Sequence, residues 1–246
     1  MNMRSILLAS IAAFACPACV QDISGGGLGA QGSDTGSGDT GSDTGTGATA
    51  SMSAAVDRST VSTELGKMVK LTYTFTSQNG FTGSLALTPP TITGWTITAN
   101  PSTVTLAASG TATAELDVMV PTDATELAPS VALGVNDGTN STSVASAFTV
   151  ANQLTIVLDA AGSAMGLHTS WPGQNAPTRI RSGTKIVFHN SDVVAHRIHS
   201  GGSITHEPSD LAPGADYIAT DIQTTTSWYC HDHEGAAGVN RPVVVE

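Results

Sequence analysis

Apolar and polar residues alternate along much of the chain, and this period of two is the feature that most restricts its fold. Successive side chains of a strand point to opposite faces, so such alternation predicts strands with one buried face. An amphipathic helix would instead show a period of 3.6 residues. We therefore expect an all-β protein. The clearest segment is 67–77, in which the alternating apolar residues are Val69, Leu71, Tyr73 and Phe75.

Two β-sandwich domains are predicted beyond residue 51. About seven short strands fill residues 52–151, separated by turn signals such as Asn79-Gly80 and Asp137-Gly138. This density of strands is typical of an immunoglobulin-like sandwich, here without the inter-sheet disulfide because the region has no cysteine. A second all-β unit is expected over residues 152–246. We predict two Greek-key sandwiches, the first acting as a spacer for the second.

The N-terminal 18 residues have the layout of a signal peptide, with a basic residue, an apolar run and small residues beside cysteines. A cysteine directly after such a run resembles the lipobox of bacterial lipoproteins. This resemblance implies a lipid on Cys19, with Cys16 as the alternative, and export to the periplasm, outer membrane or cell surface. Ordinary cleavage would instead release a soluble secreted protein. Residues 19–51 bury too little apolar surface to offset conformational entropy, so they predict a disordered tether.

The charge balance excludes two classes of partner. The chain has 9 Lys and Arg against 20 Asp and Glu, giving a formal net charge of −11. An acidic surface is repelled by nucleic acids and by anionic bilayers, so membrane contact is expected only through the N-terminal lipid. We expect a monomer whose protein partner presents a basic face.

One thiol stands apart from the N-terminal segment. Of three cysteines, only Cys230 belongs to the predicted domains, and all seven histidines lie in the second domain. A lone thiol in an oxidising compartment needs protection, which burial or a metal provides. Counting in twos places Cys230 at a strand end, with Trp228 on its face and Tyr229 on the other. His233 follows three residues later, and Cys-x-x-His can chelate one metal ion.

A third ligand is expected from a distant strand. His196 shares strand parity with Val194 and Ile198, which predicts that its side chain points inward, whereas His199 should face solvent. One cysteine and two histidines, with a weak or absent axial donor, are the ligand set of a blue-copper electron-transfer site. The same residues also suit zinc with a bound water.

At this point residues 153–246 resemble the cupredoxins, most closely the plastocyanin-like members. The motifs that carry the resemblance are GTKIVFHNSDVVAHRI (183–198), LAPGADY (211–217) and YCHDHEGAAG (229–238). The resemblance implies His196, Cys230 and His233 as the equatorial ligands of one copper ion. It further implies electron transfer with a redox protein such as a cytochrome, rather than catalysis.

The axial methionine of that family has no counterpart. Where the family places it, this chain has Gly238 and Val239. The site is then three-coordinate and closed by Val239, or takes the backbone carbonyl of Ala195, or receives Met165 or His168 from another loop.

The other histidines are predicted to have no part in the site, and several functions stay open. His189, His199 and His206 are expected on the surface without a ligand role, and His231 is expected to be a bystander. Copper is the expected cofactor, with zinc second. Three functional alternatives stay open: a copper-handling or storage surface lipoprotein, an open-site enzyme like the red-copper relatives, and a non-metal adhesive sandwich protein.

Overall fold

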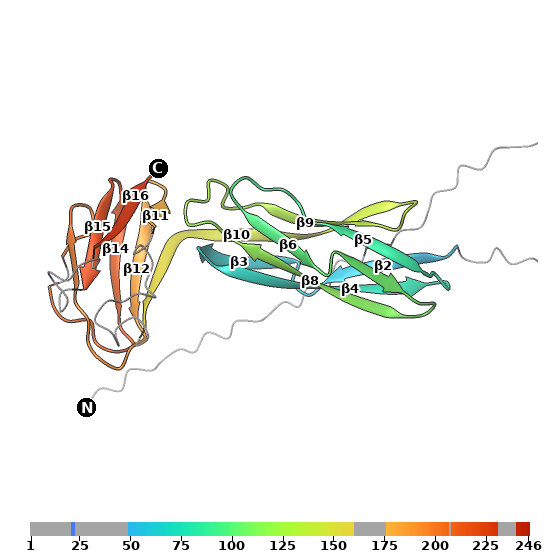
Figure 1. The fold of residues 1–246 in the computed structure, drawn as a ribbon, viewed down its shortest axis with the longest axis horizontal. Helices are drawn as coiled ribbons and strands as arrows, with labels where there is room; N and C mark the ends of the chain where they lie inside the picture. Colours follow the sequence, from blue (N-terminus) through green and yellow to red (C-terminus); the bar gives the residue numbers. More distant parts are fainter. Residues whose placement is uncertain (1–20, 23–48, 160–175, 207, 231–239) are drawn as a thin grey trace, which may run out of the picture.

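The computed structural model describes residues 21–22, 49–159, 176–206, 208–230 and 240–246. Within these ranges the chain forms strands joined by turns and loops, without any helix, so the predicted all-β class with β-sandwich architecture is confirmed (Figure 1). Accordingly, none of the described residues belongs to a helix that could cross a membrane.

Ten strands build the first sandwich, called here the first body, and the last of them, β10, continues into the second sandwich, the second body. Their bounds are β1 Gln21–Asp22, β2 Ser51–Val56, β3 Thr60–Leu65, β4 Met68–Gln78, β5 Gly83–Thr88, β6 Thr96–Asn100, β7 Thr103–Leu106, β8 Thr111–Met119, β9 Ser130–Asn136 and β10 Ser141–Leu158. One sheet has the order β1-β2-β4-β8-β6, and the facing sheet contains β3, β10, β9, β5 and β7.

Alternate residues of these strands fill the space between the sheets, as the sequence predicts. In β4, Leu71, Tyr73 and Phe75 are buried while the intervening threonines are partly or fully exposed. From the opposite side, Phe148 of β10 meets Trp95 edge-on with ring centroids 5.8 Å apart. A sheet with one face toward the core requires this alternation, because neighbouring side chains of a strand point in opposite directions.

Tyr73 is expected to make this core less stable at alkaline pH. Burial raises the pKa of the Tyr73 phenol from 10.0 to about 12, with a smaller opposing effect from Ser146. Because the folded pKa exceeds the unfolded one, the stabilising contribution is complete below pH 10 and is lost as pH rises toward 12. We expect the free energy of unfolding in urea to fall across this window, and to fall less in Tyr73→Phe. An equal fall in both proteins would contradict the assignment.

The second body is built from the end of β10 and six further strands. These are β11 Thr178–Ile180, β12 Thr184–Asn190, β13 Ile198–Gly201, β14 Asp216–Ile222, β15 Thr226–Cys230 and β16 Arg241–Val245. β10, β12 and β14 are hydrogen-bonded neighbours in one sheet, and a four-stranded sheet has the order β11-β16-β15-β13. The buried apolar residues of both bodies form one continuous cluster.

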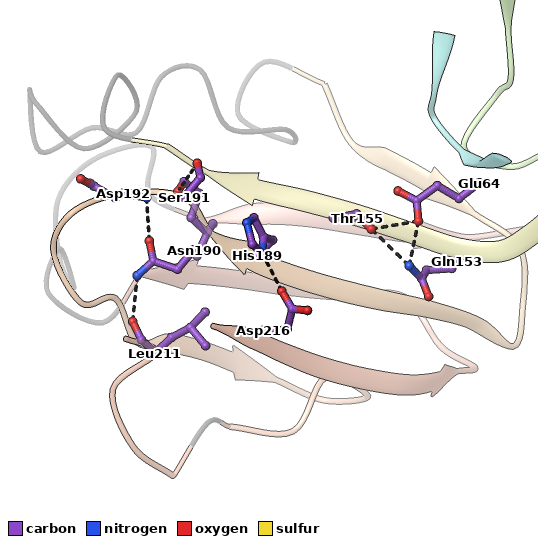
Figure 2. Close-up of polar contacts among 10 residues, drawn as sticks. Glu64, Gln153, Thr155, His189, Asn190, Ser191, Asp192, Leu211 and Asp216 are labelled. Atoms are coloured by element: carbon purple, nitrogen blue, oxygen red, sulfur yellow. Dashed lines mark hydrogen bonds and ion pairs between the residues drawn. The ribbon is translucent and has the colours of Figure 1, made fainter. Parts of the chain in front are cut away.

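Strand β10 is shared by the two sandwiches. Its 18 residues pair with β9 and β3 in the first body and, from Gln153 onward, in parallel with β12 in the second (Figure 1). The predicted domain boundary after residue 151 therefore lies inside a continuous strand, near a register shift between Ala151 and Leu154. Glu64 supports this crossing, since its Oε2 accepts hydrogen bonds from Gln153 Nε2 (2.7 Å) and Thr155 Oγ1 (3.0 Å) (Figure 2).

The predicted tether needs one correction. Residues 19–51 are expected to lack structure, but Gln21 and Asp22 form β1, which pairs antiparallel with Ala54 and Ser53 of β2. The otherwise open edge of β2 explains this, because an edge strand presents backbone groups that accept a further strand whatever its side chains. Residues 1–20 and 23–48, including Cys16 and Cys19, lie outside the described residues.

Candidate metal centre

Cys230 occupies the position that the period-two count predicts. It ends β15 with its side chain buried, at 2% exposure, on the same inward face as Trp228, while Tyr229 is only partly buried. Its register partner on β13 is Ile198, which is fully buried. The thiol is thus held inside the sandwich by strand geometry and is shielded from bulk solvent.

His196 reaches the same place from a different part of the chain. Its side chain is 2% exposed, as predicted, but its backbone belongs to an isolated bridge to Leu211 that precedes β13. The two residues exchange backbone hydrogen bonds of 3.1 and 2.6 Å. The expected inward position of Val194 is wrong: that side chain is 51% exposed, because residues 191–195 form a loop rather than a strand.

The thiol and the imidazole face each other across a distance that fits a shared metal ion. Cys230 Sγ lies 3.7 Å from His196 Nδ1. With a metal–sulfur bond of about 2.3 Å and a metal–nitrogen bond of about 2.0 Å, ligands at tetrahedral to trigonal angles lie roughly 3.5–3.7 Å apart. The separation therefore suits metal coordination without movement of either side chain, and the donor set is one that copper and zinc accept.

Asp192 fixes the orientation of the imidazole. Its Oδ2 lies 3.1 Å from His196 Nε2, and both side chains are buried. An ionised carboxylate only accepts hydrogen bonds, so this contact places the proton of a neutral imidazole on Nε2 and leaves the Nδ1 lone pair toward Cys230. A carboxylate behind a metal-binding histidine is a recurrent arrangement that orients the ring and increases its basicity. Asp192 was not among the predicted site residues, although it lies only four positions before His196 in the sequence.

Asn190 holds the loop that carries Asp192 and His196. Its Nδ2 donates to the carbonyl of Val194 at 2.9 Å. The same Nδ2 donates to the carbonyl of Leu211 (2.8 Å), and the Asn190 Oδ1 accepts from Asp192 N–H (2.9 Å) (Figure 2). The Pro-Gly turn closes on the same residue, because Gly214 N–H donates to its carbonyl at 2.7 Å with Gly214 at φ 75°. A buried asparagine with these bonds satisfied makes the loop geometry rigid.

Aromatic side chains and one cation surround the thiol strand. Phe188 packs edge-on against Trp228, with centroids 4.9 Å apart, and stacks on Tyr217 at 6.1 Å. The Arg241 guanidinium lies 5.7 Å from the centroid of Trp228 and is buried. Burial lowers the pKa of Arg241, although a guanidinium stays protonated at ordinary pH. Two buried charges of opposite sign, Asp192 and Arg241, thus belong to the domain core.

The other described histidines lie away from the thiol. His189 is partly exposed and pairs through Nδ1 with Asp216 Oδ1 at 2.7 Å, as expected for a surface residue (Figure 2). His199 has the opposite parity to His196, as predicted, but it is half-buried rather than fully solvent-facing. His206 is also half-buried, and it contacts the His199 ring. The two rings are partly covered by each other, and that of His199 also by Tyr229 of β15, so neither is fully solvent-facing.

Several predicted site residues lie outside the described residues. These are His233, His231, Met165, His168, Gly238 and Val239. Among the residues that are described, no group of three or more His, Cys, Asp or Glu side chains is arranged to hold a metal ion. The described part of the candidate centre is therefore the pair of His196 and Cys230, with Asp192 behind the imidazole.

No protein-family model matches the chain, and no curated protein sequence matches it either. Solved structures with similar folds include domains 4 and 5 of the S-layer protein SbsC (22% identity, 39% of this chain and 50% of that one, TM-score 0.27). A second is the BIgI domain of the S. agalactiae beta protein bound to CEACAM1, with 18% identity over 40% of this chain and 95% of that one and a TM-score of 0.28. A third is the Pseudomonas aeruginosa CupB2 chaperone, with 12% identity over 76% of this chain and 100% of that one and a TM-score of 0.30. The chain thus spans half of the S-layer fragment. At these TM-scores the likenesses carry no argument about function, which rests on the geometry of the site.

Proposed function

We propose that the protein is an exported copper protein that transfers electrons through a mononuclear site of His196, Cys230 and His233. The observation that carries this proposal is the buried pair of Cys230 Sγ and His196 Nδ1, 3.7 Å apart. Copper bound there would supply one-electron chemistry, since thiolate and imidazole ligands accept both of its common oxidation states. His233 follows Cys230 by three residues and is the third ligand of the proposal.

The residues around the pair support electron transfer rather than catalysis. Asp192 holds the His196 ring, and Asn190 holds the loop that carries both residues, so the ligand geometry resists change when the charge of the site changes. The thiol and the imidazole are each 2% exposed, which leaves no described route for a substrate to reach them. A protein with a net charge of −11 favours docking to a basic-faced redox partner. The place of action in the proposal is the periplasm or the cell surface.

Metal loading of the purified full chain tests the proposal. Cu(II) added under anaerobic conditions is expected to give intense visible thiolate-to-copper absorption that disappears on reduction and returns on oxidation. Zn(II) is expected to bind without colour and to be displaced by copper, as the order of metal affinities for such ligands requires. A colourless protein that binds Zn(II) as tightly as Cu(II) would overturn the copper proposal. Binding of neither metal would favour the adhesive sandwich instead.

A further inference from the structure

Two imidazole rings, separate from the candidate metal centre, lie on the outer face of the strand pair β13 and β15. His199 of β13 stacks on Tyr229 of β15, with ring centroids 4.5 Å apart and planes at 30°. His206, from the loop after β13, meets His199 edge-on, with centroids also 4.5 Å apart and planes at 81°. In the strand register, His199 pairs with Tyr229 and Ile198 pairs with Cys230. The ring cluster therefore lies directly behind the candidate metal centre, across the β-sheet backbone.

We propose that His199 and His206 form a separate surface site for a divalent first-row ion, preferring Cu(II). With metal–nitrogen bonds of about 2.0 Å, two imidazoles in cis positions on one ion have ring centroids roughly 4.5 Å apart. The observed separation of the two ring centroids, 4.5 Å, matches this value. Neutral imidazole suits copper, nickel and zinc, and copper has the highest affinity in that series. Water molecules would complete the coordination.

The loop that presents His206 is held on both sides of the residue. Three side chains donate hydrogen bonds to backbone carbonyls of this loop, and buried Ile204 anchors it to the core. The pairs are Ser200 Oγ to the carbonyl of Ile204, Tyr217 Oη to that of Thr205, and Arg197 Nη2 to that of Pro208 (2.8 Å). A metal site requires such preorganisation, because ligands that must be ordered on binding lose affinity to conformational entropy.

Both rings are accessible enough to receive an ion from solvent. His199 and His206 are each half-buried. The Nδ1 atom of His199 is buried, so Nε2 is the nitrogen through which that ring would bind. The net charge of −11 raises the local concentration of cations around the protein as a whole.

This surface site does not depend on copper in the interior. It shares no ligand with Cys230 and His196, whose side chains point to the other face. With two protein ligands and exposed waters, it would bind an ion more weakly and exchange it faster than a buried three-ligand site. Its position on the Tyr229 side of β15 places an exchangeable ion close to the thiol strand.

Substitution of His206 by phenylalanine separates metal binding from ring packing. Phenylalanine keeps an edge-on aromatic contact with His199 but has no ligand nitrogen. The two proteins to compare are the full-length Cys230→Ser variant and its double variant with His206→Phe, each titrated with Cu(II) by calorimetry and electron paramagnetic resonance. We expect the double variant to bind one Cu(II) equivalent at least tenfold more weakly and to lose one coordinated nitrogen from the spectrum. His189→Ala in the same background is the matched control and should change neither measurement.

The outcomes separate this site from the interior one. Identical titrations with and without His206→Phe would overturn the surface site, and the thiolate colour of the parent protein would be unaffected by that result. A parent without thiolate colour that still loses Cu(II) binding on His206→Phe would retain the surface site and remove the electron-transfer proposal. Circular dichroism confirms that each variant keeps its β structure, and the conservative variant His206→Gln provides a second test if the phenylalanine protein does not fold.

Discussion

Replacing Cys230 by serine is expected to abolish the visible thiolate absorption of the copper-loaded protein while leaving the β-fold in place. The absorption requires sulfur bonded to copper, and Cys230 is the only cysteine of the two domains. The hydroxyl of serine is smaller and, at neutral pH, does not become an anionic ligand. Its buried position, 2% exposed, limits the structural cost to that of one buried polar group, about 1–3 kcal/mol.

His199→Ala is the control for this prediction. His199 lies on the same strand pair, one register step away from the Ile198–Cys230 pair, but points to the outer face. The alanine variant should keep the full absorption per protein molecule, because an ion bound on the outer face has no sulfur ligand and adds no thiolate band. Equal loss in both variants would place the coloured site on the outer face and contradict the centre described here.

Replacing Asp192 by asparagine is expected to weaken copper binding at the interior site by about 10- to 100-fold, the usual effect of removing a carboxylate behind a ligand histidine. Asp192 accepts from Val193 N–H at 2.6 Å and contacts His196 Nε2 at 3.1 Å. Asparagine has one carbonyl oxygen for these two donors. If it keeps the backbone bond, its amide N–H faces Nε2 and moves the imidazole proton to Nδ1, which is the atom needed for the metal.

The matched control is Asp216→Asn. Asp216 contacts His189 Nδ1 at 2.7 Å in the same domain, but this pair is exposed and belongs to β12 and β14 (Figure 2). Competition with a copper chelator of known affinity measures both variants. Only Asp192→Asn should lose affinity, and a comparable loss in both would show that general surface charge, rather than ring orientation, governs binding.

The fold was largely predictable because strand periodicity depends on local sequence. The alternation in 67–77 reproduces the buried face of β4, and the same counting places Trp228 and Cys230 inward and Tyr229 outward. The continuity of β10 was not predictable, since Ala151, Asn152 and Gln153 carry no apolar alternation. The strand passes from one body to the other there, because Ala151 pairs with Glu64 of β3 and Gln153 pairs with Lys185 of β12. Backbone hydrogen bonds do not depend on the alternation of side chains, so the sequence pattern does not reveal them.

The pairing of His196 with Cys230 was predictable from the sequence, whereas the residues that support the pair were not. His196 and Cys230 were found from residue type and strand parity, and the structure brings their side chains together. The same parity was wrong for Val194, because it assumed that the strand extends through a loop that Asn190 instead holds folded. The pairing of His199 with His206 also escaped prediction, since it depends on how the loop after β13 folds back.

Strand β10 also limits how the two sandwiches can move relative to each other. Because one strand belongs to both sandwiches, the second body cannot swivel about residue 151 without breaking the ladder with β3 or β12. We therefore expect the two sandwiches to tumble as one elongated body rather than as two independent ones (Figure 1). The orientation of the first sandwich therefore fixes the orientation of the second sandwich, to which Cys230 belongs.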